Sequence, residues 1–138
     1  MNPEDAVRPE EIPIQFTRLA ESPLGPARAE RLVIRDAGTF RRFWQNVFPG
    51  RPLPEVSFPR ELVLVAAMGG CPNGGYWVRI QRVALRGDLL IAEVSTTFPG
   101  PSCVVTGMPT LPIDVVKVRN PSRPVRFSEA TEVTDCEE

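Results

Sequence analysis

The sequence predicts a mainly β (α+β) protein, with an antiparallel sheet or sandwich of six to eight strands and one amphipathic helix packed on it. Most apolar residues alternate with polar ones or form short runs that end at glycine or proline, which is typical of strands. Only residues 40–48 repeat their apolar side chains at helical spacing. Strands and helices do not alternate regularly, which argues against a doubly wound parallel sheet.

A first strand is predicted around Ile14, Phe16 and Leu19, and a second at 32–34. The period then changes to that of a helix. Asp36 is a suitable N-cap, and Pro49 with Gly50 ends the helix. Five large apolar side chains lie on one stripe of this helix and should cover one face of a sheet: Phe40, Phe43, Trp44, Val47 and Phe48.

Four prolines exclude a helix or central strand from 49–60, where Phe58 is expected to anchor the segment to the core. The apolar run 62–68 is typical of a strand buried on both faces. The glycine-rich segment 69–75 follows as a loop. Alternation from Tyr76 onward predicts another strand.

The alternation after Tyr76 slips by one residue, which predicts a β-bulge near Gln81 and Arg82. A hairpin turn at 86–88 leads into a strand whose inner face carries Leu90, Ala92 and Val94. Three further strands are expected: a short one at 103–105, a clear one at 113–118 and an edge strand containing Val125 and Phe127.

The length of 138 residues indicates one domain, predicted to span 12–128. Residues 1–11 are charged and interrupted by proline, so we expect a flexible arm. Residues 129–138 hold five acidic residues and no basic one, which predicts a solvated acidic tail. The polar start lacks the apolar stretch of a secretory signal, so the sequence as given predicts a cytoplasmic location unless a signal was removed.

Composition excludes several classes of function. The net charge of −1 argues against a general nucleic-acid binder, and no apolar run has the roughly 18 residues of a membrane span. The chain has no histidine, which excludes the Ser-His-Asp triad, the HExxH zinc helix and every His-ligated zinc site. We therefore expect no metal, no cofactor and no enzymatic activity. The sequence carries no indication of an oligomeric state.

The three cysteines, Cys71, Cys103 and Cys136, are an odd number, whereas a small disulfide framework usually has an even one. Two arrangements stay open: three free thiols, or a single Cys71–Cys103 bridge between two predicted loops. Catalysis by Cys71 would need a neighbouring base, and none is evident.

Three stretches of the chain stand out together. They are Val33–Asp36 followed by Phe40, Phe43 and Trp44; Leu62–Gly69 followed by Pro72–Tyr76; and Pro99–Thr106 followed by Thr110–Pro112 and Val115–Val116. Their order and spacing resemble the C-terminal domain of PrcB-type protease-complex subunits. The resemblance covers residues 31–119 and extends to a matching segment at 123–127. Where the family often has an acidic residue before the phenylalanine, this chain has Ser57 before Phe58.

The resemblance implies a subunit that associates with, and helps to stabilise, a subtilisin-like protease, and it implies an exported location. The residues themselves favour a non-catalytic protein-interaction module. Its predicted partner-binding residues lie in and after the glycine loop, where glycine backbone and aromatic side chains can meet a protein: Asn73, Gly74, Gly75, Tyr76 and Trp77.

Two alternatives remain beside this interpretation. One is a small-ligand-binding domain with a pocket between the sheet and the helix, and the other is an enzyme that uses two carboxylates in a cleft. A cationic strip is also predicted, if the arginines of one strand lie beside those near the end of the chain: Arg79, Arg82, Arg86, Arg119, Arg123 and Arg126. The ordinary interpretation of such a strip is protection of a sheet edge.

Overall fold

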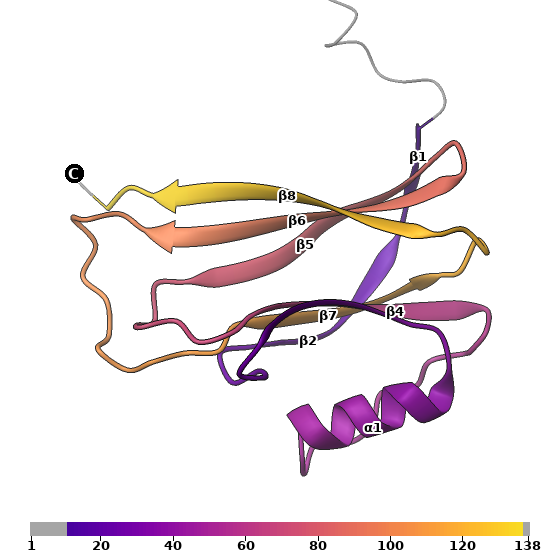
Figure 1. Cartoon of the computed structure of the whole chain (residues 1–138), viewed down its shortest axis with the longest axis horizontal. Helices are drawn as coiled ribbons and strands as arrows, with labels where there is room; N and C mark the ends of the chain where they lie inside the picture. The colour runs from indigo at the N-terminus through magenta and orange to yellow at the C-terminus, as the bar shows by residue number, and fades with distance from the viewer. Residues whose placement is uncertain (1–10, 137–138) are drawn as a thin grey trace, which may run out of the picture.

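The protein is built from two stacked β-sheets and one helix, in three layers (Figure 1). The computed structural model describes residues 11–136. Within this range, no helix is long and apolar enough to cross a membrane. The elements in chain order are β1 (Glu11–Ile14), β2 (Phe16–Ser22), β3 (Ala29–Ile34), α1 (Ala37–Val47), β4 (Glu61–Met68), β5 (Trp77–Arg86), β6 (Leu89–Pro99), β7 (Ile113–Arg119) and β8 (Val125–Thr134).

The two sheets differ in what lies on their outer faces. The sheet with strand order β2-β7-β4-β3 carries α1 on its outer face, and we call it the covered sheet. The sheet with order β1-β5-β6-β8 carries no helix among residues 11–136, and we call it the open sheet. All strand pairs are antiparallel except β6 and β8, which are parallel. The predicted sandwich of six to eight strands with one helix is confirmed.

Helix α1 begins and ends where the sequence predicts. The side chain of Asp36 accepts a hydrogen bond from the Thr39 backbone N–H at 2.8 Å and another from the Thr39 hydroxyl. These two bonds lower the pKa of Asp36. Phe40, Trp44 and Phe48 are buried against the covered sheet, and Phe43 and Val47 pack beside them. The rings of Phe58 and Phe40 pack with their centroids 6.0 Å apart. This contact confirms that Phe58 anchors the segment 49–60 to the core.

The apolar run 62–68 forms strand β4 in the middle layer of the protein. Leu62 and Leu64 face the open sheet, in the core between the two sheets, whereas Val63 and Val65 face the helix. A strand that lies in the middle layer has no solvent face, so both sets of alternating side chains must be apolar. Residues 62–67 are fully buried, as predicted.

The predicted irregularities of the hairpin β5–β6 are also present. The register of β5 against β6 shifts between Ile80 and Arg82, which places the bulge where the alternation slips. Gly87 has a φ of 57° in the turn, a conformation that glycine adopts without the steric cost of a Cβ atom.

The N-terminal segment differs from the prediction of one strand. It forms β1 in the open sheet and β2 in the covered sheet, and Gln15 lies between them. The chain thus changes sheets within a single extended run, which alternation alone does not reveal. The short strand predicted at 103–105 is wrong, because these residues form part of a loop without strand pairing.

The predicted acidic tail is wrong for the part that the structure describes. Strand β8 continues to Thr134, since its backbone pairs in parallel with β6 over its whole length. Charge does not prevent this, because Arg31 donates two hydrogen bonds to the Glu129 carboxylate at 2.9 Å each. Glu11, assigned to the flexible arm, is the first residue of β1. The rest of the arm, 1–10, and residues 137–138 lie outside the described residues.

Candidate binding site

Two long loops meet at one end of the sandwich. The first contains the glycine-rich residues 69–76, and the second runs from the end of β6 to β7. Cys71 and Thr110 exchange two backbone hydrogen bonds, of 2.8 and 3.0 Å. The Thr110 hydroxyl also donates to the Asn73 carbonyl at 2.9 Å. These bonds fix the two loops against each other.

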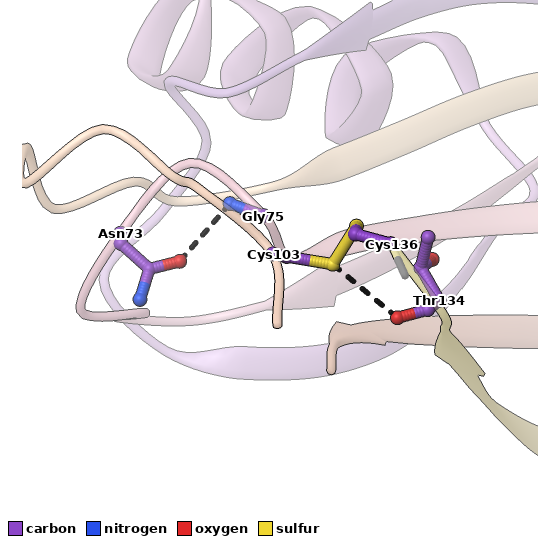
Figure 2. The surroundings of a disulfide bond; sticks show 5 residues. All are labelled: Asn73, Gly75, Cys103, Thr134 and Cys136. Atoms are coloured by element: carbon purple, nitrogen blue, oxygen red, sulfur yellow. Dashed lines mark hydrogen bonds between the residues drawn. A yellow bond between two sulfur atoms is a disulfide. The ribbon is translucent and has the colours of Figure 1, made fainter. Parts of the chain in front are cut away.

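The glycines allow the first loop to approach the second closely. The Asn73 side-chain oxygen accepts a hydrogen bond from the Gly75 N–H at 3.0 Å and closes a tight turn (Figure 2). A Cβ atom on Gly75 would lie 2.6 Å from the Pro99 ring, and one on Gly74 would lie 2.6 Å from the Thr106 hydroxyl oxygen. Larger residues at these positions would therefore push the loops apart.

A disulfide attaches the second loop to the end of β8. Cys103 is bonded to Cys136, and the Cys103 sulfur lies 3.4 Å from the Thr134 carbonyl oxygen (Figure 2). The Gly100 N–H donates to that same carbonyl at 2.9 Å. Strand β8 thus carries Cys136 along β6 to the place where the loop leaves it.

Both cysteine arrangements that the sequence left open are therefore wrong. The bridge is Cys103–Cys136, and the remaining cysteine, Cys71, is a buried free thiol. The error follows from the C-terminal residues, which were expected to form a tail and instead form a strand. Burial raises the pKa of the Cys71 thiol, which is the opposite of what a nucleophile requires.

The two loops and the disulfide enclose a groove of about 430 Å³ at the end of the open sheet. Trp77 is 44% exposed, and Val104, next to the disulfide, is fully exposed. Such side chains beside backbone glycines give a surface that is apolar but able to hydrogen bond. We call this surface the loop groove, and its residues are Gly74, Gly75, Trp77, Pro99, Cys103, Val104, Val105, Thr106, Thr134 and Cys136.

The structure separates the two aromatic residues that the sequence placed together in the binding surface. Trp77 lines the loop groove. Tyr76 is half-buried and packs edge-on against Phe98, with ring centroids 5.5 Å apart. Asn73 shapes the turn through its side chain. Of the five predicted binding residues, Gly74, Gly75 and Trp77 therefore lie in the groove, and Asn73 and Tyr76 support it.

An ion pair of the covered sheet, Arg18 with Asp114, binds the backbone of the open sheet and was not predicted from the sequence. The Arg18 guanidinium donates two hydrogen bonds to Asp114, of 2.7 and 2.9 Å, and a third to the Ile80 carbonyl. Asp114 is fully buried and accepts a further bond from the Ile80 N–H at 2.8 Å. The one signal for it was an acidic residue inside the apolar run 113–118.

This ion pair binds backbone groups of β5 at a position where β1 no longer pairs with that strand. Strand β1 pairs with β5 only at residues 83–86 and then leaves for the other sheet. The backbone groups of Ile80 are bound by Arg18 and Asp114 instead of by a strand. The pair thus joins the two sheets and is used structurally.

Three further carboxylates are also held in pairs or in a turn. Glu93 contacts Arg82, and Asp88 lies in the β5–β6 turn. Hydrogen bonds from Arg86 and Arg82 lower the pKa of Glu11. Within residues 11–136, no three His, Cys, Asp or Glu side chains gather as a metal site would require.

The predicted cationic strip is divided. Arg79, Arg82 and Arg86 lie on β5 in the open sheet, and Arg126 lies on β8 two strands away. Arg119 lies in the covered sheet. The three arginines of β5 are paired with acids, which are Glu21 for Arg79, Glu11 and Glu93 for Arg82, and Glu11 for Arg86. These pairs offset the charge of the β5 arginines, and Arg123 lies in the β7–β8 connection, where its backbone carbonyl accepts a hydrogen bond from Arg35.

The layer between helix and sheet is filled by aromatic side chains. The rings of Trp44 and Phe48 are 4.5 Å apart, and those of Phe40 and Trp44 are 5.9 Å apart. The Trp44 N–H donates to the Arg51 carbonyl at 3.2 Å. The loop groove, rather than this layer, is thus where the structure offers accessible apolar surface.

Comparison with known proteins supports the resemblance seen in the sequence. Residues 62–119 match the family model described as PrcB C-terminal. No curated protein and no solved structure matches the chain. The matched segment runs from β4 to the end of β7 and includes both loops of the groove. Residues 62–119 are therefore similar to the PrcB C-terminal family, as the resemblance predicted.

Proposed function

We propose that this protein is a non-catalytic interaction module that binds a segment of a partner protein in the loop groove. The observation that carries the proposal is the exposure of two groove residues, Trp77 at the start of β5 and Val104 in the second loop. Tryptophan is among the residues most often found at the energetic centre of protein interfaces. Burying it under a partner would remove a large apolar area from water.

The way the loops are held supports binding. The Cys103–Cys136 disulfide holds the second loop, and the Cys71–Thr110 bonds hold the first loop against it. A surface that is ordered before binding loses less conformational entropy when the partner arrives. The groove contains no acid, base or activated thiol, since its two cysteines are bonded to each other. Its chemistry suits recognition of apolar side chains and peptide backbone.

The finer proposal is that the partner is a subtilisin-like protease, which the module stabilises. Its support is the match of residues 62–119 to the PrcB C-terminal family. We propose an exported location for the same reason. The disulfide agrees with that location, because disulfides persist in oxidising compartments.

The test is co-expression of the full chain with a subtilisin-like protease from the same genome. We expect the two proteins to co-purify and the protease to survive longer than when it is expressed alone. Trp77→Ala should reduce co-purification at least tenfold, because truncation of a central tryptophan removes most of its contacts.

The matched control is Leu53→Ala, which truncates an exposed apolar residue in the proline-rich segment that follows the helix. It should bind as the unmodified chain does. Equal co-purification of a folded Trp77→Ala variant would reject the loop groove as the contact surface. Failure of the unmodified chain to bind would reject the protease as partner.

A further inference from the structure

Strand β8 forms one edge of the open sheet and presents a long free side. It pairs with β6 on one side, and no other described strand pairs with it. Eight of its ten residues are exposed, and Val133 is 65% exposed. A strand edge of this length is a template for pairing with another strand.

The hydrogen bonds of β8 identify the backbone groups that face this free side. The Pro124 carbonyl accepts a bond from Leu90, and the Thr134 carbonyl accepts one from Gly100, both at 2.9 Å. Even-numbered residues of this segment therefore direct their backbone groups toward β6. Because these directions alternate along a strand, residues 125, 127, 129, 131 and 133 direct theirs outward.

The same stretch is complementary to itself when a second copy runs antiparallel. Placing Glu129 opposite its own copy sets Arg126 opposite Glu132 and Val125 opposite Val133. The outward-directed residues then form the hydrogen-bonded pairs that an antiparallel ladder requires, which are 125 with 133, 127 with 131, and 129 with its own copy. Shifting the centre to residue 128 or 130 would set Arg126 opposite an alanine or a threonine instead.

Charge repulsion between the two Glu129 side chains at the centre does not disfavour this register. Each Glu129 is neutralised by the bidentate bond from Arg31 of its own copy. The two Arg126–Glu132 pairs contribute attraction on either side of the centre. The edge thus combines free backbone groups, opposite charges and apolar ends in one symmetric arrangement.

We propose that β8 pairs with β8 of a second copy of this chain, in antiparallel orientation about Glu129, to form a two-fold symmetric dimer. The two open sheets then join into one continuous eight-stranded sheet. Pairing of a single strand edge gives a small interface, so the dimer depends on concentration. The loop groove lies at the Thr134 end of each β8 and remains separate in the two copies.

The test is sedimentation equilibrium of the full chain with a charge-swap series. We expect a concentration-dependent dimer for the unmodified chain. Arg126→Glu and Glu132→Arg should each weaken it about tenfold, because each creates two like-charge pairs. The double variant, Arg126→Glu with Glu132→Arg, should recover the original dissociation constant, since the opposite pairs are restored with their signs reversed.

Two controls separate this result from misfolding and from the groove. Circular dichroism should show the same fold in all three charge variants, and Trp77→Ala should dimerise as the unmodified chain does. A monomer at every concentration would overturn the proposal. So would a dimer that both single variants leave unchanged, or a double variant that stays as weak as the singles.

Discussion

The covered sheet and the open sheet have the same number of strands but different surroundings. The covered sheet has a core on both faces, between helix α1 and the other sheet. The open sheet has a core on one face only, and its outer face carries arginines paired with acids. At one end it carries the loop groove, and along one edge the free side of β8.

Because of this difference, we expect the covered sheet to contribute mainly to stability and the open sheet to provide the binding surfaces. Side chains buried on both faces of β4 tolerate little change, because every truncation leaves a cavity. The loops and edge of the open sheet can vary without disturbing that core. We therefore expect substitutions in the covered sheet to affect folding, and substitutions of exposed side chains at the end of the open sheet to affect binding.

The largest effect on stability is expected from Trp44→Ala in the covered sheet. Trp44 is 2% exposed and contacts Phe40 and Phe48, so its removal leaves a cavity under the helix. The loss should be about 3–5 kcal/mol in the free energy of unfolding, measured by urea denaturation. Leu53→Ala should cost no more than about 0.5 kcal/mol. A loss below about 1 kcal/mol for Trp44→Ala would contradict the division.

Removal of the disulfide tests how much the end of the open sheet contributes to stability. The bond closes a segment of 33 residues, and replacing Cys103 and Cys136 by serine should lower stability by about 2–4 kcal/mol. The second loop would also lose its attachment to β8, so partner binding should weaken together with stability. Unchanged unfolding in this variant would mean that the loop is held by its other contacts.

The ion pair that joins the two sheets should have an intermediate effect. Asp114→Ala leaves the Ile80 N–H and the Arg18 guanidinium without their acceptor, at a cost of about 2–3 kcal/mol. Arg18→Ala and the double variant complete a double-mutant cycle. If the two single losses simply add, Arg18 and Asp114 do not act as one link between the sheets.

The smallest effect is expected at the N-cap of α1 and depends on pH. The pKa of Asp36 is lowered in the folded protein, so its contribution is present above its unfolded pKa of about 3.9 and is lost as the pH falls through the folded value. Asp36→Asn keeps a capping oxygen but does not titrate. Unfolding measured between neutral and acidic pH should show a shallower loss for this variant. An identical acid profile would contradict the assignment.

Local patterns were sufficient to predict the covered sheet and its helix. The stripe from Phe40 to Phe48, the cap at Asp36 and the apolar run 62–68 each depend on neighbours in the sequence. The bulge near Gln81 was predictable for the same reason. Each of these features depends on residues that are close together in the sequence and that repeat at the period of the helix or strand they form.

The features that the sequence did not reveal depend on distant pairing. The Cys103–Cys136 bond forms because β8 pairs with β6 and brings Cys136 to the second loop. The acidic residues of this segment are typical of a solvated tail, so the sequence did not predict a strand there. The link between Arg18 and Asp114 joins residues 96 positions apart. The glycine loop was predictable as a candidate surface, but the orientation of Trp77 toward the groove and of Tyr76 toward Phe98 follows from the register of β5.

Hydrogen–deuterium exchange of the full chain, with and without the co-expressed protease, tests the central claim most directly. We expect binding to slow exchange at residues 74–77 and 99–106, which contain most of the loop groove, and to leave helix α1 unchanged. Slower exchange in α1 with no change in the two loops would contradict it.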